Sequence, residues 1–172
     1  LYSSAASDVY KRQCESGNSG WMLRSSGNVI QFYINDGNWT GCQTSSLELN
    51  RWYHVAATYQ KGGGITLYLD GKKVGSSSCG TLQVTPNADL QAGTAPSYSD
   101  RYMRGYIQDL SLWKDVRTAE EVAADINCDF SGTEDGLNAY WPLNLNLGTS
   151  ITDKTGNHTV NLVDVVWENP EE

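Results

Sequence analysis

Side chains suited to sugar binding occur close together in the first third of the chain. Gln31 and Tyr33 lie two residues apart in an apolar run, and Asn38 and Trp39 are adjacent in the next segment. An aromatic ring can stack on the apolar face of a pyranose, and an amide can hydrogen-bond its hydroxyl groups. A long polar segment further along offers the same chemistry through Tyr98, Arg101 and Tyr102. We predict all of these residues as candidate carbohydrate contacts.

Structural roles for the same aromatic residues stay open. Trp39 fits equally well a strand residue that covers the edge of a sheet. Tyr98 and Tyr102 also fit a loop that packs on itself, although long loops in a compact β domain are often functional.

Two turn residues are candidate calcium ligands. Asp153 and Asn157 bound the turn D-K-T-G-N, and calcium prefers oxygen ligands of this kind. Aspartate in a turn also commonly accepts hydrogen bonds from its own backbone. The sequence therefore indicates no required cofactor. It suggests calcium as an optional ligand, bound at Asp153 and Asn157.

The chain has 4 cysteines, none in a C-x-x-C pair, which excludes a zinc ribbon or a thioredoxin-type motif. Cys42 and Cys79 lie in segments that a β-meander could place side by side. We predict a disulfide between them, which would support an exported location.

Composition narrows the classes of partner. The 172 residues include 12 basic and 20 acidic side chains, giving a formal charge of −8. A net acidic chain does not match the basic surface of a nucleic-acid-binding protein. No apolar stretch approaches the roughly 18 residues of a membrane-spanning helix. We therefore expect neither nucleic-acid binding nor a membrane span.

The elements that must position these residues are mostly short strands. Ile30, Phe32 and Ile34 share one face of a strand over 29–34, which leaves Gln31 and Tyr33 on the other. Turn signals separate the further strands expected over 20–24, 39–44, 52–59, 65–69, 74–78, 90–93, 105–113, 137–143 and 157–167. In the strand over 105–113 we expect Tyr106, Leu110 and Leu112 to contact the core. One helix should begin after Thr118, in a capping-box pattern, and end near Cys128.

Three motifs in order resemble a known family. They are R-W-Y-H-V-A-A-T-Y at 51–59 followed by I-T-L-Y-L-D-G-K-K-V, G-Y-I-Q-D-L-S-L-W at 105–113 followed by R-T-A-E-E-V, and G-L-N-A-Y-W-P-L at 136–143 followed by D-K-T-G-N and Trp167. Together they resemble the laminin-G-like, concanavalin A-like lectin/glucanase domain found at the C-terminus of bacterial surface proteins of polysaccharide utilisation. The resemblance implies an all-β jelly-roll sandwich with one short helix, in which Trp52, Trp113 and Trp141 are core residues.

The first residues do not fit this pattern. Residues 1–13 show no periodicity, and 8–13 resemble the product of a sequencing adaptor. We interpret 1–13 as a non-native or disordered segment. The resemblance implies two further strands upstream of Gly20, so the domain over 14–172 is expected to lack its first strands.

The fold implied by the resemblance hosts both enzymes and lectins, so side chains must decide between them. A retaining glycosidase needs two carboxylates about 5 Å apart. The sandwich glucanases carry them as E-x-D-x-x-E on one strand, whereas 105–113 offers only Asp109. We expect a non-catalytic module that binds a glycan or polysaccharide, within a larger extracellular or cell-surface protein. The alternatives are a structural or protein-interaction domain and an accessory domain of a glycoside hydrolase.

Overall fold

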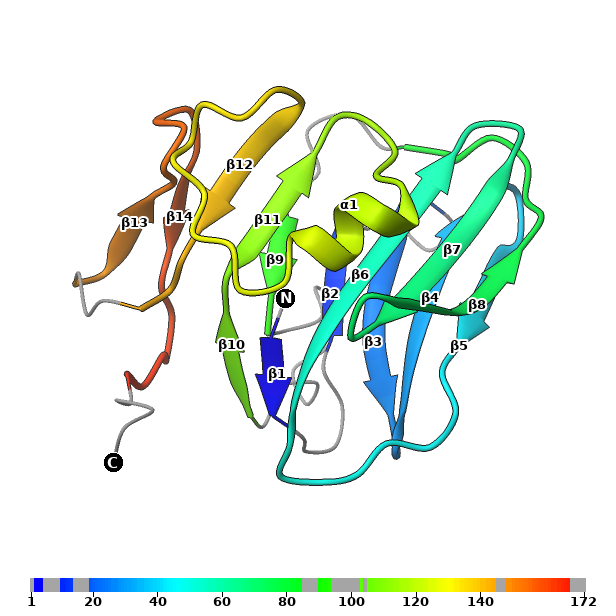
Figure 1. Cartoon of the computed structure of the whole chain (residues 1–172), viewed down its shortest axis with the longest axis horizontal. Helices are drawn as coiled ribbons and strands as arrows, with labels where there is room; N and C mark the ends of the chain where they lie inside the picture. Colours follow the sequence, from blue (N-terminus) through cyan, green and yellow to red (C-terminus); the bar gives the residue numbers. More distant parts are fainter. Residues whose placement is uncertain are drawn as a thin grey trace.

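Two five-stranded antiparallel sheets form the body of the molecule (Figure 1). The structure is a computed structural model that describes residues 2–4, 10–13, 19–84, 90–93, 103, 105–144 and 148–167, with 2–4 and 10–13 described by their backbone. The first sheet has the order β10 (Tyr106–Gln108), β1 (Tyr2–Ser4), β6 (Trp52–Gln60), β7 (Gly64–Leu69) and β8 (Lys72–Ser77). The second has the order β5 (Trp39–Gln43), β4 (Val29–Asn35), β3 (Trp21–Ser26), β2 (Tyr10–Gln13) and β9 (Leu90–Ala92).

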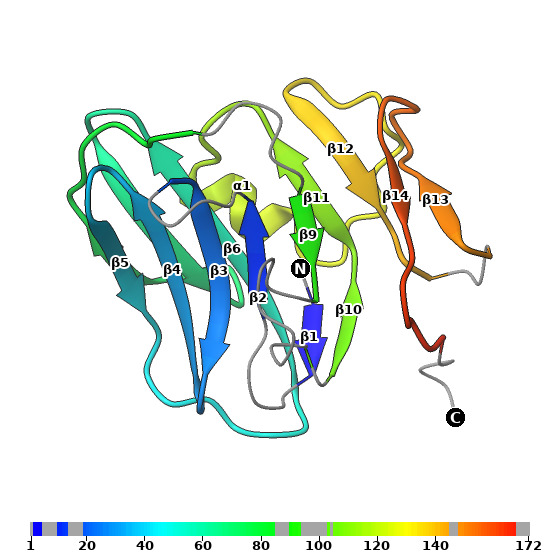
Figure 2. The same cartoon turned by 180° about the vertical axis from the view of Figure 1, so that it is seen from behind.

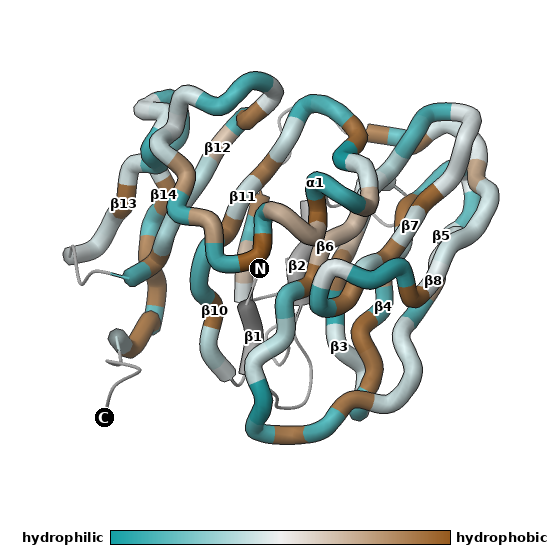
Figure 3. The backbone as a smooth tube through the Cα atoms, in the orientation of Figure 1, coloured by the Kyte–Doolittle hydropathy of each residue, from teal (hydrophilic) through white to brown (hydrophobic). Residues whose placement is uncertain are grey.

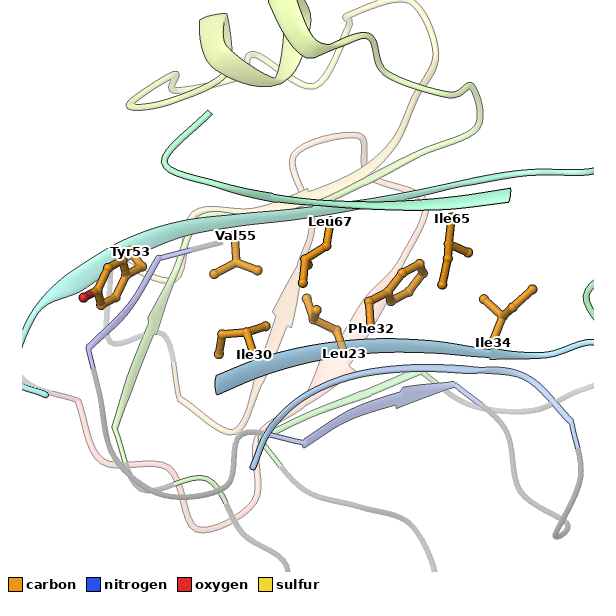
Figure 4. Packing of buried hydrophobic residues seen from close by; sticks show 8 residues of the cluster. All are labelled: Leu23, Ile30, Phe32, Ile34, Tyr53, Val55, Ile65 and Leu67. Carbon is orange, nitrogen blue, oxygen red and sulfur yellow. The ribbon is translucent and has the colours of Figure 1, made fainter. Parts of the chain in front are cut away.

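The main core lies between these two sheets. In β4 and β7, hydrophobic residues alternate with less hydrophobic ones, as the two-residue period of a strand requires (Figure 3). Phe32 and Ile34 of β4 face Ile65 and Leu67 of β7, and all four are at most 4% exposed (Figure 4). The expected division of β4 is confirmed, because its even-numbered residues 30–34 are buried while Gln31 and Tyr33 keep partial exposure.

A second, smaller core lies beside the sandwich. Here β11 (Leu110–Trp113) pairs with β12 (Leu137–Trp141), and β13 (Ser150–Thr152) pairs with β14 (Thr159–Asn161). Ala139, Trp141 and Ile151 form its centre, and Leu90 of β9 packs against them. The C-terminal strands are thereby joined to the second sheet.

The helix α1 (Ala119–Ala124) begins as its capping box predicts. The Thr118 hydroxyl accepts from the Glu121 amide, and the Glu121 carboxylate accepts from the Thr118 amide at 2.7 Å. The helix ends at Ala124 rather than near Cys128, and Val122 is its buried residue. In the part of the chain that the structure describes, no helix has the length and apolar character needed to cross a membrane.

The strand expected over 105–113 is two strands instead. Asp109 separates β10 from β11 with a positive φ of 54°, and its carboxylate accepts a 2.6 Å hydrogen bond from the Tyr140 hydroxyl. The chain thereby leaves the first sheet and pairs with β12. The expectation that Tyr106 contacts the core is wrong, since this residue is 45% exposed. Leu110 and Leu112 do pack against the smaller core.

Two strands lie upstream of Gly20. β1 pairs with β6 and β10, and β2 pairs with β3 and β9. The backbone groups of these short segments hydrogen-bond to their neighbours, which does not require a hydrophobic period. The expectation that the domain lacks its two strands upstream of Gly20 is therefore wrong. The non-native origin of residues 1–13 stays a prediction.

His54 of β6 makes stability depend on pH. Its side chain is buried, and burial lowers the pKa of His54 from 6.5 to about 4. Between these values the unfolded chain binds a proton that the folded chain does not, so stability is lost as the pH falls through this window. We expect a loss of roughly 2 kcal/mol, with partial screening allowed for. Urea unfolding across this pH range measures the loss, and His54→Gln should remove most of it. An unchanged slope in that variant would assign the effect to other groups.

Candidate functional site

The predicted residues of β4 lie on the outward side of the second sheet, opposite to the main core. Figure 2 shows this sheet in front, with β5, β4, β3 and β2 side by side. Strand register places Arg24 beside Gln31, Gln31 beside Gln43, and Tyr33 beside Gly41. Directly paired residues point to the same side of a sheet. We call the set Arg24, Gln31, Tyr33, Gly41 and Gln43 the outer β3–β4–β5 face.

Two tight turns hold these three strands in register. Gly27, in the turn between β3 and β4, has a φ of 56°, which glycine adopts without strain. The turn between β4 and β5 is fixed by Asp36, whose carboxylate accepts from the Thr40 hydroxyl at 3.3 Å and from the Gly80 amide at 2.6 Å. The hydrogen bond from Gly80 is the main cause that lowers the pKa of Asp36. The end of the site is therefore tied to the segment that follows β8.

Tyr33 lies against the backbone of the neighbouring strand. A Cβ atom added to Gly41 would stand only 2.2 Å from ring atoms Cδ1 and Cε1 of Tyr33. The ring occupies the space that a side chain at position 41 would fill, and Gly41 is the residue that permits this approach. The result is a half-exposed aromatic ring supported from below, which suits stacking on a ligand.

Polar groups line one side of this ring. The Arg24 Nε atom donates to Gln31 Oε1 at 2.8 Å, and Gln31 Nε2 donates to Gln43 Oε1 at 2.9 Å. The Arg24 Cζ atom lies 5.3 Å from the centre of the Tyr33 ring, within the range of a cation–π contact. A guanidinium has five N–H donors, so Arg24 can donate to a ligand while it holds Gln31.

Trp39 and Asn38 lie at one end of the outer β3–β4–β5 face. Trp39 pairs with Asn35 two residues beyond the Tyr33–Gly41 pair, and it is half-buried. Asn38 is exposed in the adjoining turn. The register thus brings Gln31, Tyr33 and Trp39 onto one face with Asn38 beside it. Tyr98, Arg101 and Tyr102 lie outside the described residues.

Three members of the face were not anticipated from the sequence. Arg24, Gly41 and Gln43 come from the strands on either side of β4. A signal for them existed in the two expected turns, because each turn fixes which residue pairs with Gln31 and Tyr33. The close approach of Tyr33 to Gly41 has no such signal in the local sequence.

Asp153 has a well-defined structural role. Its buried carboxylate accepts hydrogen bonds from the backbone amides of Tyr140, Thr155, Asn157 and His158, and from the Thr155 hydroxyl at 2.6 Å. Calcium would have to compete with these donors for the same oxygens. Among the described residues, no group of three or more His, Cys, Asp or Glu side chains could hold a metal ion. Calcium at Asp153 and Asn157 stays a prediction.

The predicted disulfide is wrong. Cys42 and Cys79 are both free thiols, and each packs against the main core as a small apolar side chain. Burial raises the pKa of both thiols. A raised pKa lowers the thiolate fraction and hence the reactivity of these cysteines.

Comparison with known proteins agrees with this architecture. Ten chains of known structure match it, among them a protein from Bacteroides ovatus that has been proposed to bind carbohydrate. That protein is 22% identical, with a TM-score of 0.68 over 95% of this chain, and the chain spans 58% of its length. A search of curated proteins found no match.

The family comparison confirms the predicted fold. A laminin-G model, described as the concanavalin A-like lectin/glucanases superfamily, matches residues 2–123, which include every strand of the two five-stranded sheets. The two sheets and the single short helix in the described residues are those of its all-β sandwich. The chain therefore belongs to the concanavalin A-like lectin/glucanases superfamily.

Proposed function

We propose that this chain is a non-catalytic carbohydrate-binding module and that the outer β3–β4–β5 face holds its ligand. The observation that carries the proposal is the Tyr33 ring, supported by Gly41 and flanked by the Arg24–Gln31–Gln43 chain. A pyranose would place its C–H face on the ring and its hydroxyls toward the guanidinium and amides. The similar Bacteroides ovatus protein, itself proposed to bind carbohydrate, supports this class of ligand.

The chemistry of the face favours binding over hydrolysis. The polar side chains beside Tyr33 are a guanidinium and two amides, whereas glycoside hydrolysis uses a pair of carboxyl groups. The superfamily includes glucanases, so the absence of catalysis is part of the proposal. Release of reducing sugar from a bound polysaccharide, abolished by one carboxylate substitution in this chain, would overturn it.

The proposal includes a location and a context. We place the module in an extracellular or bacterial cell-surface protein that has further domains. The similar solved protein supports a larger parent, because this chain spans 58% of its length. The formal charge of −8 supports a glycan rather than a nucleic acid as partner.

Affinity electrophoresis tests the proposal. The protein is run through native gels that contain laminarin, xylan, galactomannan or starch, with serum albumin as a non-binding reference. We expect at least one polysaccharide to retard the protein, and titration calorimetry should give saturable heat with the same polymer. If no polymer in a broad panel causes retardation or heat, the carbohydrate proposal fails. A structural or protein-interaction domain would then be the better interpretation.

Gly41→Ala tests how the Tyr33 ring is supported. The new methyl group would overlap the Tyr33 ring, so the ring must move away from the backbone of β5 at residue 41. We expect affinity for the retarding polysaccharide to fall by about threefold or more, or at least about 0.7 kcal/mol, with little change in melting temperature.

Gly63→Ala is the matched control for that substitution. The three atoms nearest to a Cβ atom at position 63 all belong to the flexible side chain of Gln60, which can move aside. Its affinity should equal that of the wild type. Equal affinities of the wild type and Gly41→Ala would mean that the ring position does not matter for binding.

A further inference from the structure

A pair of exposed aromatic residues lies on the opposite sheet. Trp52 is 38% exposed and Tyr106 is 45% exposed, although both were expected in the core. Their ring centres are 6.1 Å apart, and the ring planes make an angle of 38°. The two rings therefore contact each other while each keeps a substantial surface open to solvent.

Strand register explains why these two rings meet. Ser4 of β1 pairs with Trp52 of β6 on one side and with Tyr106 of β10 on the other. Both residues therefore point to the same side of the first sheet. Tyr53, the next residue of β6, is buried in the main core, so Trp52 points away from it. Residues two strands apart have backbones about 9.6 Å apart, whereas these ring centres are 6.1 Å apart. The two rings therefore lean toward each other across β1.

An amide stands beside the pair. Gln108 is two residues from Tyr106 on β10 and is half-buried, so it shares the outward side of the sheet. Tyr106 and Gln108 thus repeat the arrangement of Gln31 and Tyr33 on β4, where an aromatic ring and an amide lie two residues apart. We call Trp52, Tyr106 and Gln108 the outer β6–β10 patch.

We propose that the outer β6–β10 patch is a second carbohydrate-binding site, on the face opposite to the outer β3–β4–β5 face. The proposal extends the proposed function to a second surface of the same module. One hexose unit would stack on the two rings and take a hydrogen bond from the Gln108 amide. A module with a site on each outer face would bind two glycan chains at once and link them.

The size of the patch favours a sugar over a protein partner. From the exposed fractions, the two rings together offer roughly 200 Å² of surface. A stable protein interface needs about 800 Å² on each partner. The neighbouring residue Arg51 is charged, with a side chain 54% exposed and ion-paired to Asp70 at 3.0 Å. Arg51 therefore limits the apolar area on its side of Trp52. Among the described side chains, two rings of this size suit a single sugar unit.

Indole N–H signals in ¹⁵N–¹H spectra test this site directly. The Trp52 signal is identified by its loss in Trp52→Phe, and the full chain is titrated with cellohexaose, maltohexaose, xylohexaose and mannohexaose. We expect one hexaose to shift the Trp52 signal. The shift should persist in Tyr33→Ala and need at least fivefold more hexaose in Tyr106→Ala. Val74→Ala, on β8 of the same sheet and equally exposed at 38%, should titrate as the wild type. Thermal melting confirms that each variant is folded.

The possible results separate this inference from the proposed function. If a hexaose shifts signals around Tyr33 but not that of Trp52, the second site is wrong and the proposed function stands. A Trp52 shift that disappears in Tyr33→Ala also overturns an independent second site. A Trp52 shift without any effect around Tyr33 would support the patch and refute the outer β3–β4–β5 face. If no hexaose moves either region, the second site is wrong, and the proposed function fails with it when no polysaccharide retards the protein either.

Discussion

Tyr33→Ala is expected to weaken polysaccharide binding by tenfold or more while the protein stays folded. The substitution removes the aromatic surface of the outer β3–β4–β5 face and the cation–π contact with Arg24, whose Cζ lies 5.3 Å from the ring centre. Tenfold corresponds to about 1.4 kcal/mol, within the range of an aromatic contact combined with a cation–π interaction. Calorimetric titration with the polysaccharide that retards the wild-type protein measures the change.

Two further variants show which part of Tyr33 matters. Tyr33→Phe keeps the ring and should retain most of the affinity, because stacking uses the face of the ring and not its hydroxyl. Leu49→Ala, at a position 58% exposed and outside the face, should bind as the wild type. If Tyr33→Ala binds as tightly as Leu49→Ala, the ligand does not lie on this face.

The sequence predicts the parts of this molecule that depend on local pattern. The alternation over 29–34 places Phe32 in the core and Tyr33 outside, since a strand has a period of two. The capping box at Thr118 predicts where α1 begins, because its two hydrogen bonds join residues three apart. These features need only neighbours along the chain.

The features that sequence reasoning misses depend on distant partners. β1 and β2 are too short to show a period, and they form strands through pairing with β6, β10, β3 and β9. The chain changes direction at Asp109 because this residue bonds to distant partners. Its carboxylate accepts from the hydroxyl of Tyr140 in β12, and its amide donates to the carbonyl of Pro142, the residue after β12. Trp52 points outward because Tyr53 is buried in the main core, and pairing through β1 brings it beside Tyr106 of the distant strand β10.

Asp153→Ala is expected to lower the free energy of unfolding by about 3 kcal/mol. The carboxylate binds four backbone amides and one hydroxyl, and it is 4% exposed. A buried donor that loses its acceptor costs about 1–3 kcal/mol, and water can replace only some of these bonds. Urea unfolding measures the loss, and amide exchange should show it first in β12, β13 and β14. Asp135→Ala, at an exposed acid of the same region, should change stability little.

A further variant, Asp153→Asn, tests the calcium prediction. Calcium that binds the folded protein raises its melting temperature. If added calcium raises the melting temperature of the wild type but not that of Asp153→Asn, Asp153 is a ligand. Equal responses of the two proteins would refute the prediction.

Lowering the pH below about 3.8 should reduce the free energy of unfolding more in the wild type than in Asp153→Asn. Burial raises the pKa of Asp153, but the hydrogen bonds from Thr155, His158 and Tyr140 outweigh burial and hold the pKa below 3.8. A carboxyl group whose pKa is depressed by folding stabilises the protein above its unfolded pKa, and this stabilisation is lost as the pH falls through the folded value. The loss from Asp153 therefore begins near pH 3.8, below the window in which His54 titrates. In urea unfolding at decreasing pH, the stability curves of the wild type and Asp153→Asn should converge below this pH. Parallel curves would show that Asp153 does not carry the charge that holds the β13–β14 turn.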